Sequence, residues 1–464
     1  MSSLSRRWLG NSSANLIGGA SAAAFNLALP AIVSRHLTTA EFAAWSLALQ
    51  IVAYITLLGL GLQTATARAI AQAEGRQDTK AMLDIARAAR SISTWATAAA
   101  AMAAVLLAAC YPLLFPSIPD DLLGAFRLAV LLIGLSTASQ LMALVPMGVF
   151  QGLHRNVVFV SVQVAMRLLA VAMVWAGASA GITLLGLAAL LAASSALLWP
   201  TLRWLMRSRL PWSRMIDTVG LDRARRRELF DYCASLSIWG VATLLVNSVG
   251  VIMVGHVAFE QTGTYSLAMS ASTVLAGLLG AVFSPLVTTG AALRAQPERQ
   301  GELPSLLMKS TVWCAVLLNL LFLVCLVLVR DIIGLWVGPG FVAPLTPLLL
   351  TLVGAHALRN LGTPYAMMLL ATGLHRRALL TGVAEGVCNL VATVLLGQRF
   401  GVVGIASGTL VGAVAGLVGA LVLNTRKTPE LTPRPLRFAV VGLLLPLALF
   451  APLDLFVIHW KALI

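Results

Sequence analysis

Residues 32–49 read IVSRHLTTAEFAAWSLAL, and residues 252–269 read IMVGHVAFEQTGTYSLAM. The two stretches place a histidine over a histidine and share Ser-Leu-Ala at an offset of 220 residues. A second pair, Gly152-Leu-His-Arg and Gly373-Leu-His-Arg, repeats at an offset of 221. Two matches at almost the same offset indicate that the chain contains two copies of one structural unit.

The composition around these repeats is that of a protein embedded in lipid. Of the 464 residues, 59% are hydrophobic and 11% are charged, and the mean hydropathy is +0.91. Soluble chains carry about 25% charged residues, and a helix needs roughly 20 apolar residues to cross a membrane. Lipid leaves backbone polar groups no partner outside the helix, so these stretches predict an all-α integral membrane protein. Thirteen stretches are long enough: 13–34, 41–64, 92–115, 123–150, 157–177, 182–200, 231–256, 264–290, 306–329, 345–370, 378–397, 402–424 and 437–458.

The positive charge of the chain predicts its orientation. The net charge is +15, and with the N-terminus in the cytoplasm most of the 32 Lys and Arg residues fall in cytoplasmic loops. This asymmetry follows the positive-inside rule, so we expect membrane lipids and no nucleic acid as partners of the basic residues.

The spans divide into two lobes because six of them make one repeat. An even number of spans brings both copies into the membrane in the same sense, which gives parallel repeats and a transporter architecture. We therefore predict a six-helix lobe over 1–200, a basic cytoplasmic linker over 201–230, a second six-helix lobe over 231–424 and an accessory C-terminal helix over 425–464.

Ionisable residues inside the spans are the first candidates for function, because charges at membrane depth are costly. Arg167 and Arg359 lie in the middle of their spans, and the planar fork of arginine suits a phosphate-like anion. Glu385, and His356 one turn from Arg359, are candidates for coupling to a proton or a sodium ion. An alternative is a structural ion pair between Arg167 and Glu385, which fall within one turn of each other on repeat-equivalent helices.

Further candidates lie in the first and seventh spans and at the ends of the first hairpin. Asn26 and Asn247 fall one position apart in the repeat alignment, and glycines and Pro30 predict that these two spans are softened or interrupted, as at many transport sites. Arg35 and Arg68 flank the membrane portion of the first hairpin, where each either marks the interface or reaches into a cavity mouth.

Soluble-enzyme motifs are missing from the sequence. It contains no phosphate-binding or dinucleotide-binding glycine loop and no His/Cys cluster with metal spacing, and its five cysteines form no CxxC pair. The adjacent acids Asp120 and Asp121 precede a span and suit a helix N-terminus. We therefore predict no cofactor, no metal and no enzymatic activity.

The stretch from Leu29 to Arg68 resembles the N-terminal hairpin of Wzx-like polysaccharide-biosynthesis flippases, a branch of the multidrug/oligosaccharidyl-lipid/polysaccharide exporter superfamily. Gln151-Gly-Leu-His-Arg155 is similar to the family's short cytoplasmic turn. The resemblance implies an alternating-access protein of the bacterial inner membrane that moves a polyprenyl-pyrophosphate-linked oligosaccharide to the outer leaflet. It further implies Arg35 and Arg68 as cavity residues, and a polysaccharide polymerase and other assembly proteins as partners.

Three other functions compete with this interpretation. A cation-coupled multidrug antiporter of the same superfamily needs carboxylates at membrane depth, and within the twelve core spans the sequence offers Glu385 alone. A membrane glycosyltransferase or ligase needs a sizeable outer loop, and the predicted outer loops are short. A scaffold without transport does not account for arginines at membrane depth.

Overall fold

A computed structural model describes residues 3–59, 61–217, 226–231, 233, 249–294 and 296–445. Asn247 and most of the predicted spans 231–256 and 437–458 lie outside these residues. Within the described part of the chain every regular element is a helix, which confirms the predicted all-α class. The chain divides into two compact units, Met1–Leu244 and Leu245–Ile464.

Ten helical stretches of the described residues are long and apolar enough to cross a membrane. The last of them, Leu380–Lys427, contains the two predicted spans 378–397 and 402–424, which meet at a kink where Gly401 has φ +58°. Only glycine adopts this left-handed conformation readily, so the chain reverses there and forms a helical hairpin.

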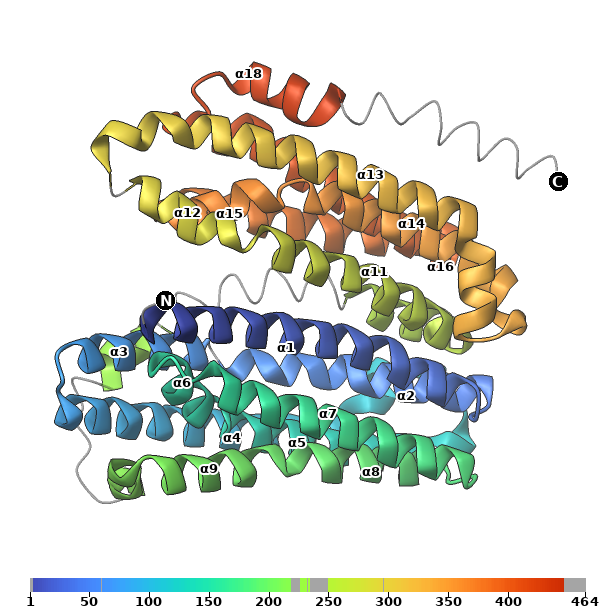
Figure 1. The fold of residues 1–464 in the computed structure, drawn as a ribbon. Coiled ribbons are helices and arrows are strands. Elements are labelled where there is room, and N and C mark those ends of the chain that lie inside the picture. Colours follow the sequence, from blue (N-terminus) through green and yellow to red (C-terminus); the bar gives the residue numbers. More distant parts are fainter. Residues whose placement is uncertain are drawn as a thin grey trace. The chain divides into compact units, whose positions relative to one another are not determined.

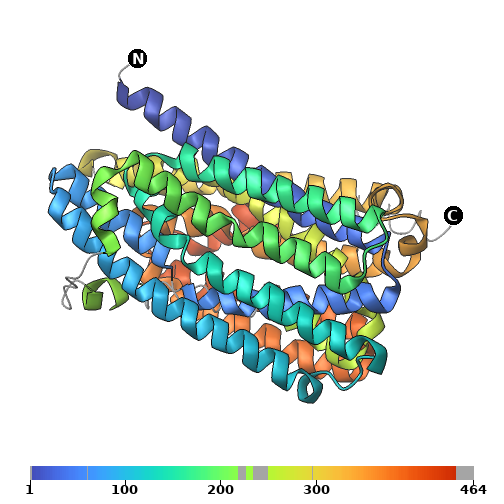
Figure 2. The ribbon, with the colours of Figure 1, turned by 90° about the horizontal axis from the view of Figure 1, so that it is seen from below.

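The first unit is a bundle whose long helices run side by side (Figure 1; Figure 2). Apolar side chains from its helices meet in one core that includes Ile70, Phe150, Phe159 and Leu202. Its helices are α1 (Ser3–Ser34), α2 (Thr39–Ala53), α3 (Leu62–Gly75), α4 (Thr79–Leu114), α5 (Asp120–Leu141), α6 (Leu144–Gly152), α7 (Asn156–Ser179), α8 (Leu184–Ala196) and α9 (Leu198–Arg209), with short helices η1 (Tyr54–Gly59) and η2 (Pro211–Asp217).

The second unit repeats this plan. Its helices are α11 (Thr262–Phe283), α12 (Pro285–Arg294), α13 (Leu303–Trp336), α14 (Val342–Asn360), α15 (Thr363–Thr372), α16 (Leu379–Gly419), α17 (Thr425–Lys427) and α18 (Pro435–Arg437), with short helices η3 (Phe259–Gln261), η4 (Pro297–Glu302), η5 (Pro339–Phe341), η6 (His375–Ala378), η7 (Ala420–Asn424) and η8 (Phe438–Leu444). In both units the second span packs on the fourth, the third on the fourth, and the fourth on the closing hairpin.

The interruptions of the spans also repeat. The second span is broken between α2 and α3 and between α11 and α12, and the fourth is broken between α5 and α6 and between α14 and α15. The expectation of an interrupted first span is wrong, because α1 continues through Pro30 to Ser34. Since proline at this position does not break the helix, the interruptions of the first unit lie in its second and fourth spans and, between α8 and α9, in its sixth.

One pair of hydrogen bonds shows the repeat at the level of single atoms. The Ser93 hydroxyl on α4 donates to the carbonyl oxygen of Leu141, at 2.8 Å, where α5 ends. In the second unit the Cys314 thiol on α13 donates to the carbonyl oxygen of Asn360, at 3.5 Å, where α14 ends. Ser93 and Cys314 are 221 residues apart, which is the offset of the sequence repeat. Each satisfies a carbonyl that the break leaves without a helical partner.

Candidate functional site

Arg167 lies near the middle of α7 and reaches across to α1. Its Nη1 donates to the carbonyl oxygen of Gly18, at 2.9 Å, and to the Ser21 hydroxyl, at 2.7 Å. The close approach of the two helices needs glycine at position 18, because a methyl group there would stand 3.1 Å from Val160. Both partners of Arg167 are neutral, so the half-buried guanidinium keeps its positive charge at membrane depth in the first unit.

The other candidates of the first unit lie apart from Arg167 along the chain and are exposed. Asn26 is on α1, Arg35 follows the end of α1, and Arg68 is on α3. Arg35 and Arg68 both have interactions within the chain. The structure brings Arg167 together with Ser21 rather than with these three residues, so their predicted contact with a substrate stays a prediction.

Glu385 on the first arm of α16 forms an ion pair with Arg359, whose Nε donates to the Glu385 carboxylate. The two side chains are mostly buried, with 18% exposure for Arg359 and 17% for Glu385. Both residues belong to the second unit, so the alternative that pairs Glu385 with Arg167 does not describe the ion pair found here. Arg359 lies in the last turn of α14, where the carbonyl end of the helix favours a cation.

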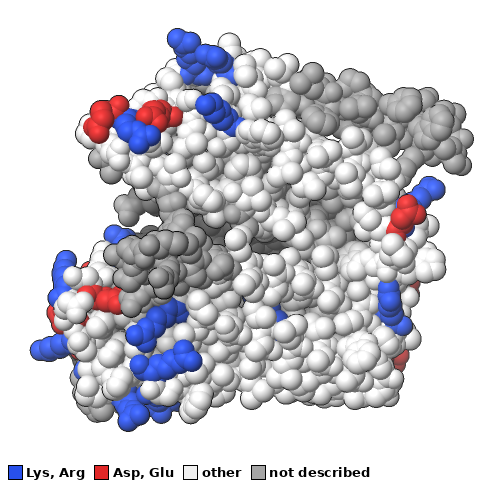
Figure 3. All heavy atoms as spheres, viewed as in Figure 1, with Lys and Arg blue, Asp and Glu red and all other residues white. Residues whose placement is uncertain are grey.

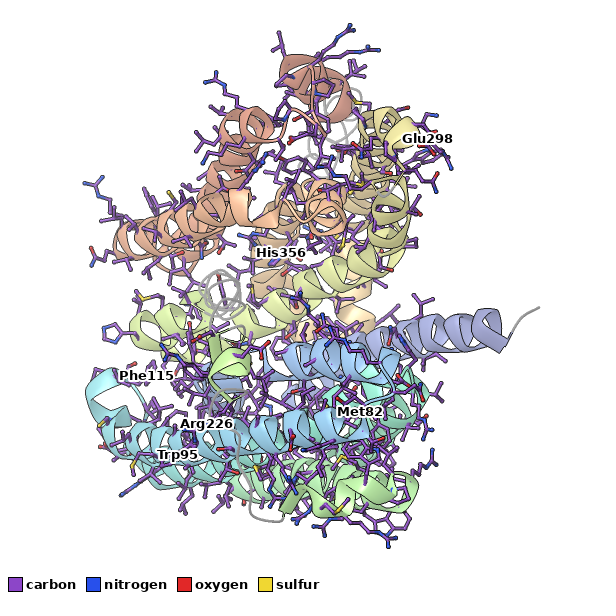
Figure 4. All side chains as sticks on the ribbon, turned by 90° about the vertical axis from the view of Figure 1, so that its left-hand side faces the viewer. Met82, Trp95, Phe115, Arg226, Glu298 and His356 are labelled. Atoms are coloured by element: carbon purple, nitrogen blue, oxygen red, sulfur yellow. The ribbon has the colours of Figure 1, made fainter. Side chains whose placement is uncertain are left out.

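His356 lies one turn before Arg359 and is 1% exposed. Figure 4 shows it inside the second unit, among the helices that surround it. Among the described residues, neither of its ring nitrogens nor the Arg359 Nη1 and Nη2 atoms have a hydrogen-bond partner. The break that follows is closed locally, because the Asn360 side chain donates to the carbonyl oxygen of His356 at 2.8 Å. The tenth predicted span therefore places a mostly buried guanidinium against a carboxylate and a buried imidazole one turn before that guanidinium.

Glu385 belongs to a polar face that the sequence analysis missed. Thr381, Glu385, Asn389 and Thr393 recur every four residues on the first arm of α16, so they share one side of the helix. Thr381 and Asn389 are buried, and Thr393 is 0% exposed. We call these four residues the polar face. Their four-residue spacing inside an apolar stretch was readable in the sequence.

The polar face packs against glycines on the second arm of α16. A methyl group at Gly412 would stand 2.6 Å from the Asn389 Cβ, and one at Gly408 would stand 2.5 Å from the Thr393 backbone. A methyl group at Gly416 would overlap the Glu385 carboxylate. Small residues spaced by four let membrane helices approach closely, and this pattern was a second readable signal.

Charged side chains are unevenly distributed over the surface of the described residues (Figure 3). On the face drawn in Figure 3, Lys, Arg, Asp and Glu gather toward the helix ends, and most of the surface between them is uncharged. Such a surface suits contact with lipid along its middle.

The comparison with protein families is decisive for identity. The profile of the family described as "Polysaccharide biosynthesis protein" matches residues 9–289, which is more than half of the chain. The chain belongs to the polysaccharide biosynthesis protein family. The resemblance drawn from the hairpin at Leu29–Arg68 is thereby confirmed. A search of curated protein sequences finds no significant match.

Solved structures with the same fold are membrane transporters and flippases. An inward-facing multidrug resistance transporter of the MATE family in the MOP superfamily has a TM-score of 0.73 at 17% identity, and the match covers 88% of this chain and 94% of that one. The lipid II flippase MurJ in an inward closed conformation has a TM-score of 0.70 at 11% identity, covering 98% and 99%. A MOP superfamily transporter from Pyrococcus furiosus has a TM-score of 0.60 at 14% identity, covering 91% and 96%. These likenesses show that this family member has the fold of a multi-pass transporter or flippase.

Proposed function

We propose that the protein is an alternating-access flippase for a polyprenyl-pyrophosphate-linked oligosaccharide. It moves this lipid from the cytoplasmic to the outer leaflet of the bacterial inner membrane, for the assembly of O-antigen, capsule or exopolysaccharide. Its N-terminus lies in the cytoplasm, and a polysaccharide polymerase and other assembly proteins act on the product. Family membership over residues 9–289 supports a role in polysaccharide biosynthesis.

The observation that carries the proposal is the position of Arg167 at membrane depth and its pairing, among the described residues, with neutral groups alone. The guanidinium stands near the middle of a 24-residue membrane helix, and its hydrogen-bond acceptors are a carbonyl and a hydroxyl. A positive charge at membrane depth costs free energy, so its presence there marks a functional residue. The planar guanidinium of arginine binds two oxygens of a pyrophosphate at once. The fold shared with a protein described as a lipid II flippase supports the same class of cargo.

Arg359 was the second predicted anion contact, and Glu385 and His356 the predicted coupling residues. We propose that the second unit couples ion movement to flipping through Glu385. When the Glu385 carboxylate binds an ion, it must give up its ion pair with Arg359, which changes the contact between α16 and α14. Arg359 is paired with Glu385, and His356 lies one turn before Arg359 on α14, so we assign both residues to this coupling site.

The competing function is that of a cation-coupled multidrug antiporter, and the MATE fold supports it. A cationic drug needs a carboxylate, and among the described residues at membrane depth this role falls to Glu385, which already neutralises Arg359. A retained positive charge at Arg167 opposes a cationic cargo. The flippase is therefore the function that the side chains support better.

The test is translocation in proteoliposomes. A polyprenyl-pyrophosphate oligosaccharide is incorporated, and its access to an impermeant lectin is followed with and without the protein. We expect protein-dependent translocation, a loss of at least about tenfold in Arg167→Ala, since an arginine–anion contact contributes on the order of 1.5–3 kcal/mol, and normal rates in the exposed control Arg76→Ala.

Two further variants guard against a simple folding defect. Arg167→Lys keeps the charge without the planar fork and is expected to translocate at an intermediate rate. Ser21→Ala removes one anchor of Arg167 and is expected to weaken translocation while the protein accumulates normally. Export of organic cations without movement of any glycan would establish the antiporter instead.

A further inference from the structure

The polar face of α16 is not required by the fold of the hairpin. The repeat supplies the comparison, because the hairpin of α7 and α8 in the first unit turns at Gly181 as the α16 hairpin turns at Gly401. At offsets of 220 or 221 residues, the positions matching Glu385, Asn389 and Thr393 are occupied only by apolar residues: Val164, Ala165, Leu168, Leu169, Ala172 and Met173. The same architecture therefore forms with an apolar face, and the polar residues of the second unit have another role.

Polar groups continue from this face toward one end of the second unit. The Asn424 amide donates to the Thr381 hydroxyl at 2.8 Å, and the Thr428 hydroxyl donates to the carbonyl oxygen of Asn424 at 3.0 Å. The hydroxyls of Thr428 and Tyr365 are 2.7 Å apart. From Thr381 to Thr393 the face spans about 18 Å along the helix, which is over half of the roughly 30 Å hydrocarbon layer. Hydrogen-bonding groups thus follow one another along α16 on both sides of Glu385.

The groups that face Glu385 discriminate between coupling ions. α14 contributes one cation, the Arg359 guanidinium, while the second arm of α16 contributes Gly416 at the matching level. Nearest along the polar face are the neutral side chains of Thr381 and Asn389. A guanidinium in contact with the carboxylate repels a sodium ion, whereas a proton binds to the carboxylate itself and removes its charge.

Building on the flippase proposed above, we propose that the coupling ion is a proton and that Glu385 binds it. In this step the Glu385 carboxylate takes up one proton from water and becomes a neutral carboxyl group. Arg359 keeps its charge and loses its ionic partner, so the contact between α14 and α16 weakens. The polar face and its continuation through Asn424 and Thr428 form the route by which the proton reaches Glu385.

Labelling with dicyclohexylcarbodiimide tests the site without any lipid-linked substrate. This apolar reagent modifies carboxyl groups that are protonated in apolar surroundings, and peptide mass spectrometry locates the modified residue. We expect the labelling of Glu385 to rise about tenfold for each unit by which the pH is lowered, until the carboxyl is mostly protonated. We expect no protection by sodium chloride compared with potassium chloride. Because the assay needs no cargo, it can succeed or fail independently of the flipping assay.

The variant Arg359→Met is the matched control for reactivity. Loss of the guanidinium favours the neutral carboxyl, so labelling of Glu385 at a fixed pH should rise several-fold. Protection of Glu385 by sodium ions would overturn the proposal and assign a sodium site. Absence of labelling in both the unaltered protein and Arg359→Met, at every pH, would overturn it as well.

The route is tested by proton uptake into proteoliposomes that contain a pH-sensitive dye. We expect Asn389→Leu and Thr393→Val to slow uptake several-fold, and Glu385→Gln to abolish it. The control Ser407→Ala removes a partly exposed hydroxyl on the second arm, which among the described residues bonds only within its own helix, and should leave uptake unchanged. Unchanged uptake in the first two variants would show that protons reach Glu385 by another path and would overturn the proposed route.

Discussion

The ion pair between Arg359 and Glu385 makes a quantitative prediction about stability. The perturbation is a double-mutant cycle with Arg359→Met, Glu385→Met and the double variant, in which methionine replaces each charge by a flexible apolar side chain. Either single substitution leaves the remaining charge largely buried and without its ionic partner. The double substitution removes both charges at once.

The magnitude follows from the burial of the pair. Removing one partner of a buried ion pair costs about 3–5 kcal/mol, because the other charge stays desolvated. Arg359 and Glu385 keep 18% and 17% exposure, so we expect the lower end of that range, about 3 kcal/mol for each single variant. The double variant leaves no buried charge and should cost less than the two single variants together, with a coupling energy of about 2 kcal/mol.

The assay is unfolding in mixed micelles titrated with a denaturing detergent. The 11 tryptophans supply a fluorescence signal, and the free energy of unfolding is compared among the four proteins. The ion pair of Arg377 with Glu430 is the matched control, because its side chains are 48% and 35% exposed at 3.3 Å. Its cycle should give a coupling energy below about 1 kcal/mol.

A coupling energy near zero at Arg359 and Glu385 would refute the reasoning. It would mean that neither charge depends on the other for its stability in the membrane. A single variant more stable than the unaltered protein would refute it equally, because the burial penalty would then exceed everything that the pair contributes.

Three further predictions concern the backbone of the fold. Gly408→Val should destabilise the second unit by about 3 kcal/mol, because the valine side chain would meet the backbone of Thr393. The control Gly280→Ala has open space around it, and its melting temperature in detergent should stay within a few degrees of that of the unaltered protein. Gly401→Ala should cost about 1–2 kcal/mol in detergent-induced unfolding, since φ there is +58°. Thr38→Ala removes a capping box at the start of α2 and should cost about 1 kcal/mol by the same measurement.

Within the described residues, hydropathy was sufficient to predict which segments form long apolar helices. The span predicted at 157–177 lies within α7, and the two spans predicted at 378–397 and 402–424 are the arms of one hairpin. The internal breaks after α5 and α14 were not predictable in this way, because hydropathy reports whether a segment is apolar enough to cross the membrane and not where its helix is interrupted. Pro30 suggested a break that α1 does not have, because proline is tolerated inside membrane helices and does not by itself end one.

The candidate site was predictable in its residues but not in its contacts. Arg167, Arg359, Glu385 and His356 were all selected because ionisable groups inside a span are costly. The repeat offset placed Glu385 close to the equivalent of Arg167, yet equivalence under a repeat is not spatial contact, and the partner of Glu385 is Arg359. The packing of α14 against α16 within the second unit determines this pairing, and the offset of the sequence repeat contains no information about that packing.

The pairing separates two roles that the sequence assigned to Arg359 and Glu385 independently. An anionic substrate is disfavoured at Arg359 while Arg359 is paired with the ionised Glu385, because the substrate and the carboxylate would repel each other. Two like charges about 4 Å apart repel by about 4 kcal/mol at an effective dielectric constant of 20. Arg167 meets no such opposition, since its acceptors are the neutral carbonyl of Gly18 and the hydroxyl of Ser21. In the mechanism that we propose, the first unit therefore binds the pyrophosphate and the second unit binds the coupling ion.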